Sequence, residues 1–294
     1  MSRENVSARL RQRILERANA ALSDPGRELR PDAAAWVLIA LHREPGEGDL
    51  LSRINAGLMK AQLEDGRVPV NPRFPNAPWP TPLAVLAWIG REDSKAALDR
   101  AVQYLLTWRG RHWINREPET VGHDTSIPGW PWVSGTHSWI EPTGLCMLAL
   151  RGAGRGNDER CALAARMILN RQLPSGGWNY GNTTVFQTQL RPMPHSTGVA
   201  LAALAGSPGI ARQEVAKSID YLTETVGTIR APLSLGWSLT GLAAWDAEPP
   251  AAPDWIAESL EREKELPEYD LSLLSVLYCA AQPKSENPLL SLNS

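Results

Sequence analysis

Ionisable and aromatic side chains gather in one stretch of the chain, "GHDTSIPGWPWVSGTHSWIE", residues 122–141. Within about twenty residues it carries two histidines, three tryptophans and two carboxylates, namely His123, Asp124, Trp130, Trp132, His137, Trp139 and Glu141. Carboxylates and imidazoles can exchange protons with a substrate, and indole faces attract cations. The stretch therefore predicts an acid/base site with aromatic walls. The alternative is a loop, broken by Pro and Gly, that needs large side chains as anchors.

Glu141 and His195 are the main catalytic candidates because each begins an apolar run, "IEPTGLCMLAL" and "MPHSTGVALAAL". If these runs are equivalent helices, the two side chains face one cavity and form an acid/base pair, with Asp124 as a further carboxylate. Both residues also have a structural alternative. Glu141 can cap its helix, and His195 can cap its own helix or bond a loop carbonyl.

A repeating pattern of helices must position these residues. Six apolar segments, most of them opened by a proline or a small capping residue, cover 30–41, 78–89, 140–150, 193–204, 231–245 and 269–281. Each follows an amphipathic segment, and these cover 6–22, 50–62, 95–108, 158–171, 211–225 and 253–265. The alternation predicts an all-α protein: a single α/α toroid of six helical hairpins, with twelve helices in an outer and an inner ring.

The whole sequence, 1–294, is accounted for by this one domain. Its widest interruption, at about 109–138, predicts a functional loop over one mouth of the barrel.

The turn "QLPSGGWNYG" connects this architecture to a family. Gln172, Gly176 and Trp178 resemble the QW repeat of squalene-hopene and oxidosqualene cyclases. Gln62 and Gly66 in "KAQLEDGRVPVNP" are similar to the corresponding turn of protein prenyltransferase β subunits. The resemblance, to the prenyltransferase/squalene cyclase-like (terpenoid cyclase) superfamily, implies structural roles. The glutamine would bond free carbonyls at the end of an outer helix, and the tryptophan would stack against the next repeat.

The resemblance also implies an enzyme that acts on a hydrophobic isoprenoid in a central cavity, by acid-initiated cyclisation, isomerisation or prenyl transfer. In class II cyclases an Asp-x-Asp-Asp-Thr motif supplies the proton. With its Thr laid on Thr143, Glu141 falls at the donor position, whereas both flanking aspartates are absent. The alternative is therefore a non-catalytic isoprenoid-binding, lipid-binding or protein-interaction toroid. Squalene cyclases also use two such domains, so a second subunit or a smaller substrate would be needed.

Five of the loop residues are candidates for contact with the substrate: Trp130, Trp132, Trp139, His137 and His123. For Trp130 and Trp132 anchoring is the preferred interpretation, because they alternate around Pro131 and do not easily face one pocket. No metal or other cofactor is predicted, since His123, Asp124, His137 and His195 match no standard ligand spacing.

The composition limits the kinds of binding partner and the cellular compartment that we expect for this protein. A net charge of -2 gives no reason to expect nucleic acid, and three cysteines are too few for a disulfide framework. The charged N-terminus lacks a signal-peptide core, and no apolar run is long enough to cross a bilayer. We expect a cytoplasmic protein, with peripheral contact to a membrane as an open alternative.

Overall fold

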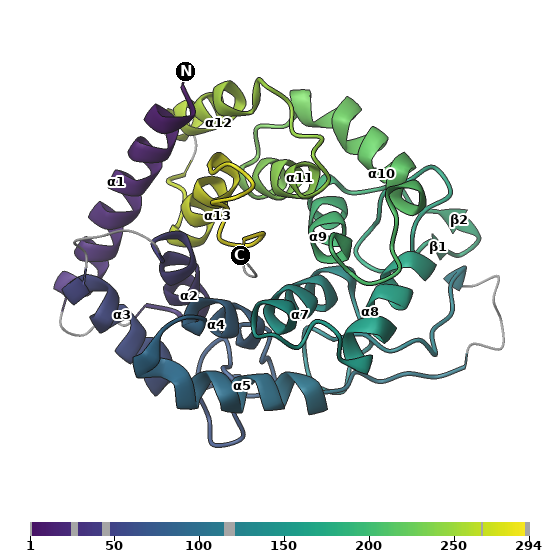
Figure 1. Ribbon diagram of the computed structural model, residues 1–294, viewed down its shortest axis with the longest axis horizontal. Helices are drawn as coiled ribbons and strands as arrows, with labels where there is room; N and C mark the ends of the chain where they lie inside the picture. The colour runs from purple at the N-terminus through teal and green to yellow at the C-terminus, as the bar shows by residue number, and fades with distance from the viewer. Residues whose placement is uncertain (1, 25–28, 43–47, 115–120, 266, 292–294) are drawn as a thin grey trace.

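The computed structural model describes residues 2–24, 29–42, 48–114, 121–265 and 267–291. Within these ranges, amphipathic outer helices alternate with apolar inner ones, and the predicted all-α class is confirmed (Figure 1). The outer helices are α1 (Arg3–Ser23), α3 (Gly48–Lys60), α5 (Lys95–Thr107), α8 (Glu159–Asn170), α10 (Arg212–Thr225) and α12 (Ala252–Glu261). The inner helices are α2 (Pro31–Ala40), α4 (Thr81–Trp88), α7 (Ile140–Gly152), α9 (Pro194–Leu204), α11 (Pro232–Ala244) and α13 (Leu271–Ala281). Short 3-10 turns accompany them at η1 (Glu92–Ser94), η2 (Val226–Thr228) and η3 (Arg262–Lys264).

The inner helices contact one another in a closed cycle. The order of contact is α2, α4, α7, α9, α11 and α13, and α13 returns to α2. Because α1 packs on both α13 and α12, the first helix of the chain covers the last inner one. The two ends of the helical array therefore meet side by side.

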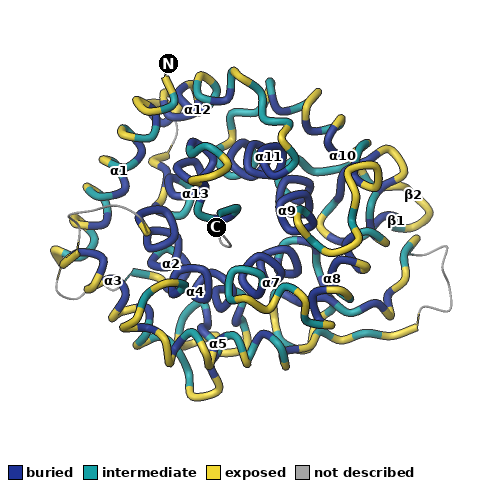
Figure 2. The backbone as a smooth tube through the Cα atoms, in the orientation of Figure 1, coloured by how far each residue is buried: buried dark blue, intermediate teal, exposed yellow. Residues whose placement is uncertain are grey.

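Burial follows the two layers. Leu148 in α7 and Leu201 in α9 are fully buried, as are most residues of the inner helices beyond their first turns (Figure 2). The outer helix α1 buries only one face, with Val6, Leu10 and Ile14 at four-residue spacing. An inner helix is enclosed by its ring neighbours and its outer partner, so it needs no polar face.

Glycines allow the inner ring to be narrow. A Cβ atom on Gly198 of α9 would lie 2.2 Å from the carbonyl oxygen of Trp237 in α11. A Cβ atom on Gly241 would lie 2.6 Å from the carbonyl oxygen of Gly198. The backbones of α9 and α11 thus approach more closely than any other residue type permits.

The side chains of the inner helices that remain partly exposed are concentrated in their first turns.

The turns after α3 and α8 have the same design. Gly66 N–H donates to the carbonyl of Leu63, and Gly176 N–H donates to that of Leu173, at 2.9 and 2.8 Å. Both glycines have φ near +90°, at 93° and 91°. A Cβ there would meet the backbone of the next outer helix, so glycine is required at both turns.

The predicted role of Gln172 is wrong. Its Nε2 donates to Oγ of Ser218 in α10 at 2.7 Å, and so joins two outer helices. The carbonyl near the end of α8 is bonded instead by Trp178, whose Nε1 donates to Ile168 O at 2.7 Å. The indole folds back over its own turn, and this leaves the amide of Gln172 free to reach the next repeat. Trp178 is fully buried, at 0% exposure.

One element has no counterpart in the sequence prediction. β1 (Thr184–Val185) pairs antiparallel with β2 (Thr188–Gln189) in the connection between α8 and α9. The two turn residues, Phe186 and Gln187, have φ of 47° and 63°. This conformation favours Gly or Asn, so the sequence of the turn gave no hairpin signal.

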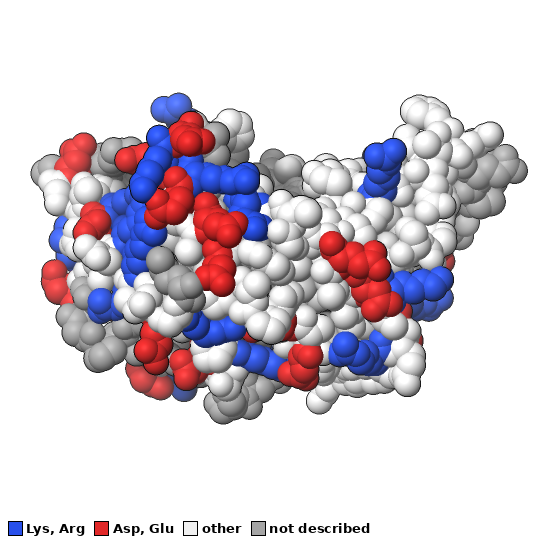
Figure 3. Space-filling model, turned by 90° about the horizontal axis from the view of Figure 1, so that it is seen from above, with Lys and Arg blue, Asp and Glu red and all other residues white. Residues whose placement is uncertain are grey.

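Charged side chains fasten the outer layer where the chain ends meet. Figure 3 shows both signs interspersed on the side of α1 and α12. Arg9 of α1 pairs with Glu261 of α12 at 2.6 Å, and Arg3 pairs with Glu248 at 3.0 Å.

None of the helices in the described ranges combines the length and the apolar character that crossing a bilayer requires.

Candidate functional site

The first turns of the inner helices form one end of the ring, which we call the N-terminal mouth. Glu141 and His195 lie there, in the first turns of α7 and α9, and each is partly exposed. His195 Nε2 is 3.4 Å from Glu141 Oε1. Nε2 is itself buried and makes no hydrogen bond. The two predicted catalytic groups are thus brought together, with Nε2 of the imidazole nearest the carboxylate.

Two tryptophans lie in the ring interior beneath this pair. The ring of His195 faces that of Trp237 at a centroid distance of 6.4 Å, and Trp237 meets the ring of Trp36 at 6.0 Å with an angle of 73°. Trp36 is in α2 and Trp237 in α11, which are not neighbours in the ring, so their contact crosses its interior. Below the mouth, two indoles therefore occupy the part of the interior that lies between α2 and α11.

These tryptophans were missed because each stands inside an apolar run that was assigned to the core as a whole. Their sequence signal is the residue type: each is the one indole in an inner helix that is built mainly of small and aliphatic residues.

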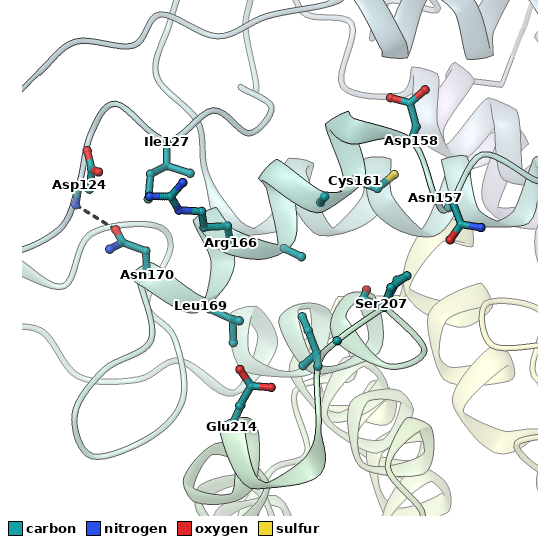
Figure 4. A pocket seen from close by; sticks show the side chains of 16 residues that line it. Asp124, Ile127, Asn157, Asp158, Cys161, Arg166, Leu169, Asn170, Ser207 and Glu214 are labelled. Atoms are coloured by element: carbon teal, nitrogen blue, oxygen red, sulfur yellow. Dashed lines mark hydrogen bonds between the residues drawn. The ribbon is translucent and has the colours of Figure 1, made fainter.

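Asp124 does not join the Glu141–His195 pair. Its Oδ1 accepts hydrogen bonds from the backbone N–H and the hydroxyl of Ser126, at 2.9 and 2.6 Å, and these bonds lower the pKa of the carboxyl. Its own N–H donates to Asn170 Oδ1 at 2.9 Å, at the end of α8. Figure 4 shows it at one end of a groove of about 760 Å³, with Arg166 and Leu169 of α8 on one side and Glu214 of α10 on the other. Asp124 organises the loop and this outer groove.

Trp130 is a buried anchor, as the preferred interpretation had it, and its place among the candidates for substrate contact is wrong. Its side chain is fully buried, and its Nε1 donates to Leu105 O at 3.0 Å. The guanidinium of Arg160 lies 4.2 Å from the centre of its ring. Trp132 is half-buried and meets Trp79 edge to face at 5.7 Å, just before α4.

The remaining predicted residues border a separate small cavity. It has a volume of about 170 Å³, and we call it the histidine pocket; its lining is His112, Trp113, Val121, His123, Thr125, His137, Arg171 and Asn182. Trp139, which precedes α7, packs against His137 with the ring centroids 4.3 Å apart and the rings tilted by 41°. The loop expected at 109–138 therefore builds a pocket of its own. Part of that loop, 115–120, lies outside the described residues.

Burial and one neighbouring cation set the protonation of this pocket. Burial first, and then the positive charge of Arg171, lowers the pKa of His137, and both also lower the pKa of His123, to about 4. The same causes lower the pKa of His112, while a hydrogen bond to the backbone of Thr125 opposes them. Burial lowers the pKa of Arg171 to about 10, which leaves it charged at neutral pH. At neutral pH the pocket therefore holds neutral imidazoles beside one cation.

Within the described residues, no group of three or more His, Cys, Asp and Glu side chains is arranged to hold a metal ion. Cys146 and Cys279 are fully buried in inner helices, and this burial raises the pKa of both thiols. They pack as small core residues.

Comparison with known proteins provides a fold and no activity. No family model matches the chain, and no curated protein matches it. Among solved structures, it is similar to the crystal structure of a protein from Actinoplanes, with a TM-score of 0.58 and 15% sequence identity. The alignment covers 94% of this chain and 98% of that one. At this identity the likeness concerns the arrangement of the helices alone.

Proposed function

We propose that the N-terminal mouth binds a hydrophobic molecule of the isoprenoid class, and that Glu141 and His195 move a proton on it. The observation that supports this most is the 3.4 Å separation of the two side chains at the starts of neighbouring inner helices. A carboxylate at such a helix start is stabilised by the helix dipole. A base and an acid are thus held on one side of a common site.

Isomerisation of a double bond suits this pair better than cyclisation. One group removes a proton from an allylic carbon, and the other returns a proton to the far carbon of the double bond, so no net charge is created. Cyclisation would need a stronger acid than an isolated glutamic acid, and an enclosed chamber for the folded chain. Trp36 and Trp237 take up part of the ring interior beneath His195, which makes the site shallow on that side.

The same shallow interior favours a second candidate, a binding module without turnover. A ligand would then rest its apolar part at the mouth, on the aromatic floor, and Glu141 would serve only as a helix cap. A protein-interaction role is the corresponding possibility for a larger partner. These candidates differ from isomerisation in one measurable respect, the exchange of a carbon-bound proton.

The deciding experiment measures deuterium uptake into a polyprenyl alcohol, such as geranylgeraniol, incubated with the protein in D₂O. Binding is measured by the change in tryptophan fluorescence. We expect Glu141→Gln to retain binding and to lose the deuterium uptake, because the amide keeps the shape of the side chain and cannot transfer the proton. Glu159→Gln is the matched control, since Glu159 occupies the first turn of an outer helix, away from the mouth. Uptake that survives Glu141→Gln would make Glu141 a cap. Binding without uptake by the unmodified protein would favour the binding module.

A further inference from the structure

Arg171 is the unusual residue of the histidine pocket. Its side chain is almost fully enclosed, with the residue 3% exposed, and it directly follows α8. Nη1 donates to the carbonyl of Ser138 at 2.6 Å, whereas Nε is buried without a hydrogen-bond partner. Leaving a charged donor buried and unpaired is costly, so such an atom points to a missing acceptor.

His112 provides a second unpaired atom in the same pocket. Its Nε2 is buried and also has no hydrogen-bond partner. Both residues line the same cavity. Two residues from separate parts of the chain, each with a buried and unpaired nitrogen, therefore line one small cavity.

A second buried arginine shows what a purely structural role looks like. Arg160 of α8 donates from Nη2 to the carbonyls of Trp108 and Gly129, both at 3.2 Å, and its guanidinium lies over the face of Trp130. It leaves Nε and Nη1 unpaired as well, but it lines none of the cavities described above. Arg171 differs because its guanidinium borders a cavity, so a ligand can supply what the protein does not.

We infer that the histidine pocket binds a small organic carboxylate, with its oxygens toward Arg171 and His112 and its apolar part against Trp113 and Val121. Among the described residues that line the pocket there is no Asp or Glu, so none of these side chains competes for the guanidinium. Guanidinium and carboxylate form short, charge-assisted hydrogen bonds. Because the hydrogen bond to the backbone of Thr125 uses the other ring nitrogen of His112, Nε2 donates to the anion only when the ring is protonated, and a bound anion favours that protonated form.

Charge and size favour a carboxylate over phosphate. With neutral imidazoles, the described lining of the pocket offers one positive charge, that of Arg171. One positive charge balances a monoanion, whereas one of the two negative charges of a phosphate dianion would stay unbalanced. Among the described carboxylates, Asp124 acts on Arg171, and it does so from an exposed position. The pocket has a volume of about 170 Å³, which is the volume that roughly five or six molecules occupy in liquid water. This is enough for a carboxylate with a short apolar tail. This site is independent of the Glu141–His195 pair.

The test uses butyrate as the probe and inorganic phosphate as the alternative anion. The chain has five histidines, so the ring proton signals of each can be assigned by single substitutions and followed by NMR. We expect butyrate to shift the signals of His112, His123 and His137 in a saturable manner, and to leave those of His42 and His195 in place. Saturable binding of phosphate without binding of butyrate would overturn the carboxylate assignment. An equal shift of all five signals, or none, would overturn the site.

Two variants locate the anion. Arg171→Lys keeps the charge and loses the planar fork, and His112→Phe keeps the bulk and loses the nitrogen; we expect each to weaken butyrate binding by about tenfold or more. His42→Asn is the matched control, because His42 is exposed and lies outside the pocket. Should Arg171→Lys fail to fold, His112→Phe still decides the question. Unchanged affinity in His112→Phe would remove this residue from the site and contradict the inference.

Discussion

Trp130 and Trp178 occupy the same position in two successive repeats. The backbone N–H of each donates to a threonine hydroxyl in the first turn of the next inner helix, Thr143 at 2.9 Å and Thr197 at 3.0 Å. The indole N–H of each donates to a carbonyl near the end of the preceding outer helix. One tryptophan thus connects an outer helix, a turn and an inner helix.

We expect Trp178→Ala to lower the free energy of unfolding by roughly 3 to 5 kcal/mol, because it removes a fully buried indole and leaves the Ile168 carbonyl without that donor. Urea denaturation measures the change. Trp113→Ala is the control, since Trp113 is 46% exposed and should cost about 1 kcal/mol or less. Equal losses in the two variants would contradict the anchoring role of Trp178.

The pH dependence of stability tests the environment of His123. Its pKa is about 4 in the folded protein and near 6.5 in an unfolded chain. Between these values the unfolded chain binds more protons, so the free energy of unfolding decreases as the pH falls from about 6.5 to about 4, and this contribution levels off below that. We expect His123→Gln to reduce the decrease measured by urea denaturation at pH 7, 6, 5 and 4. A variant with the same slope as the parent would show that His123 is solvated in the folded state.

At the scale of elements, the sequence predicted the helices because each pattern is local. The spacing of Leu10 and Ile14 with arginines on the opposite face identifies an outer helix, and prolines followed by Ala, Leu and Val identify inner ones. The Gly66 and Gly176 turns were also predictable, since a reversal with positive φ requires glycine.

The parts that sequence reasoning missed depend on contacts between distant segments. Nothing near Gln172 indicates that its partner is Ser218, and nothing near Arg171 indicates that three histidines face it. Asp124 and Trp130 stand only a few residues apart, yet one is exposed on the outer surface and the other is buried. A cluster of reactive residues in one loop therefore did not predict which of them share a site.

Two glycine-to-alanine substitutions distinguish two effects on stability, the close packing of helices and the helix propensity of the residue. We expect Gly198→Ala to destabilise the protein by several kcal/mol, because the added methyl would lie 2.2 Å from the carbonyl oxygen of Trp237. Gly57→Ala in α3 has no atom within 4 Å of the new methyl and should stabilise by about 0.5 to 1 kcal/mol. Thermal unfolding monitored by circular dichroism compares the two. A neutral Gly198→Ala would mean that α9 and α11 can move apart freely.

For the molecule as a whole, the decisive feature is where the chain ends meet. Arg3 Nη1 donates to the carbonyls of Ala281 and Gln282 at the end of α13, both at 3.1 Å. Beyond α13 the chain continues over the end of that helix, where Asn287 Nδ2 donates to Cys279 O at 2.8 Å and Leu289 is buried. The last inner helix is thus bonded to the first outer helix and covered by the C-terminal segment. In a linear array of repeats each unit contacts only its neighbours along the chain, whereas here the first and last units contact each other.

Native-state hydrogen exchange tests this closure. Leu277 is fully buried in α13, so Leu277→Ala should lower the free energy of unfolding by about 2 to 5 kcal/mol. Because α13 contacts α2 as well as α11, we expect amide protection to fall in α2 (Pro31–Ala40) as much as in α11, although some 240 residues separate Leu277 from α2. Ile114→Ala is the control, because Ile114 is 79% exposed and should leave both helices unchanged. Loss of protection in α11 with none in α2 would show that the two ends open independently, and the contacts between α13 and α2 would then contribute little to the stability of the ring.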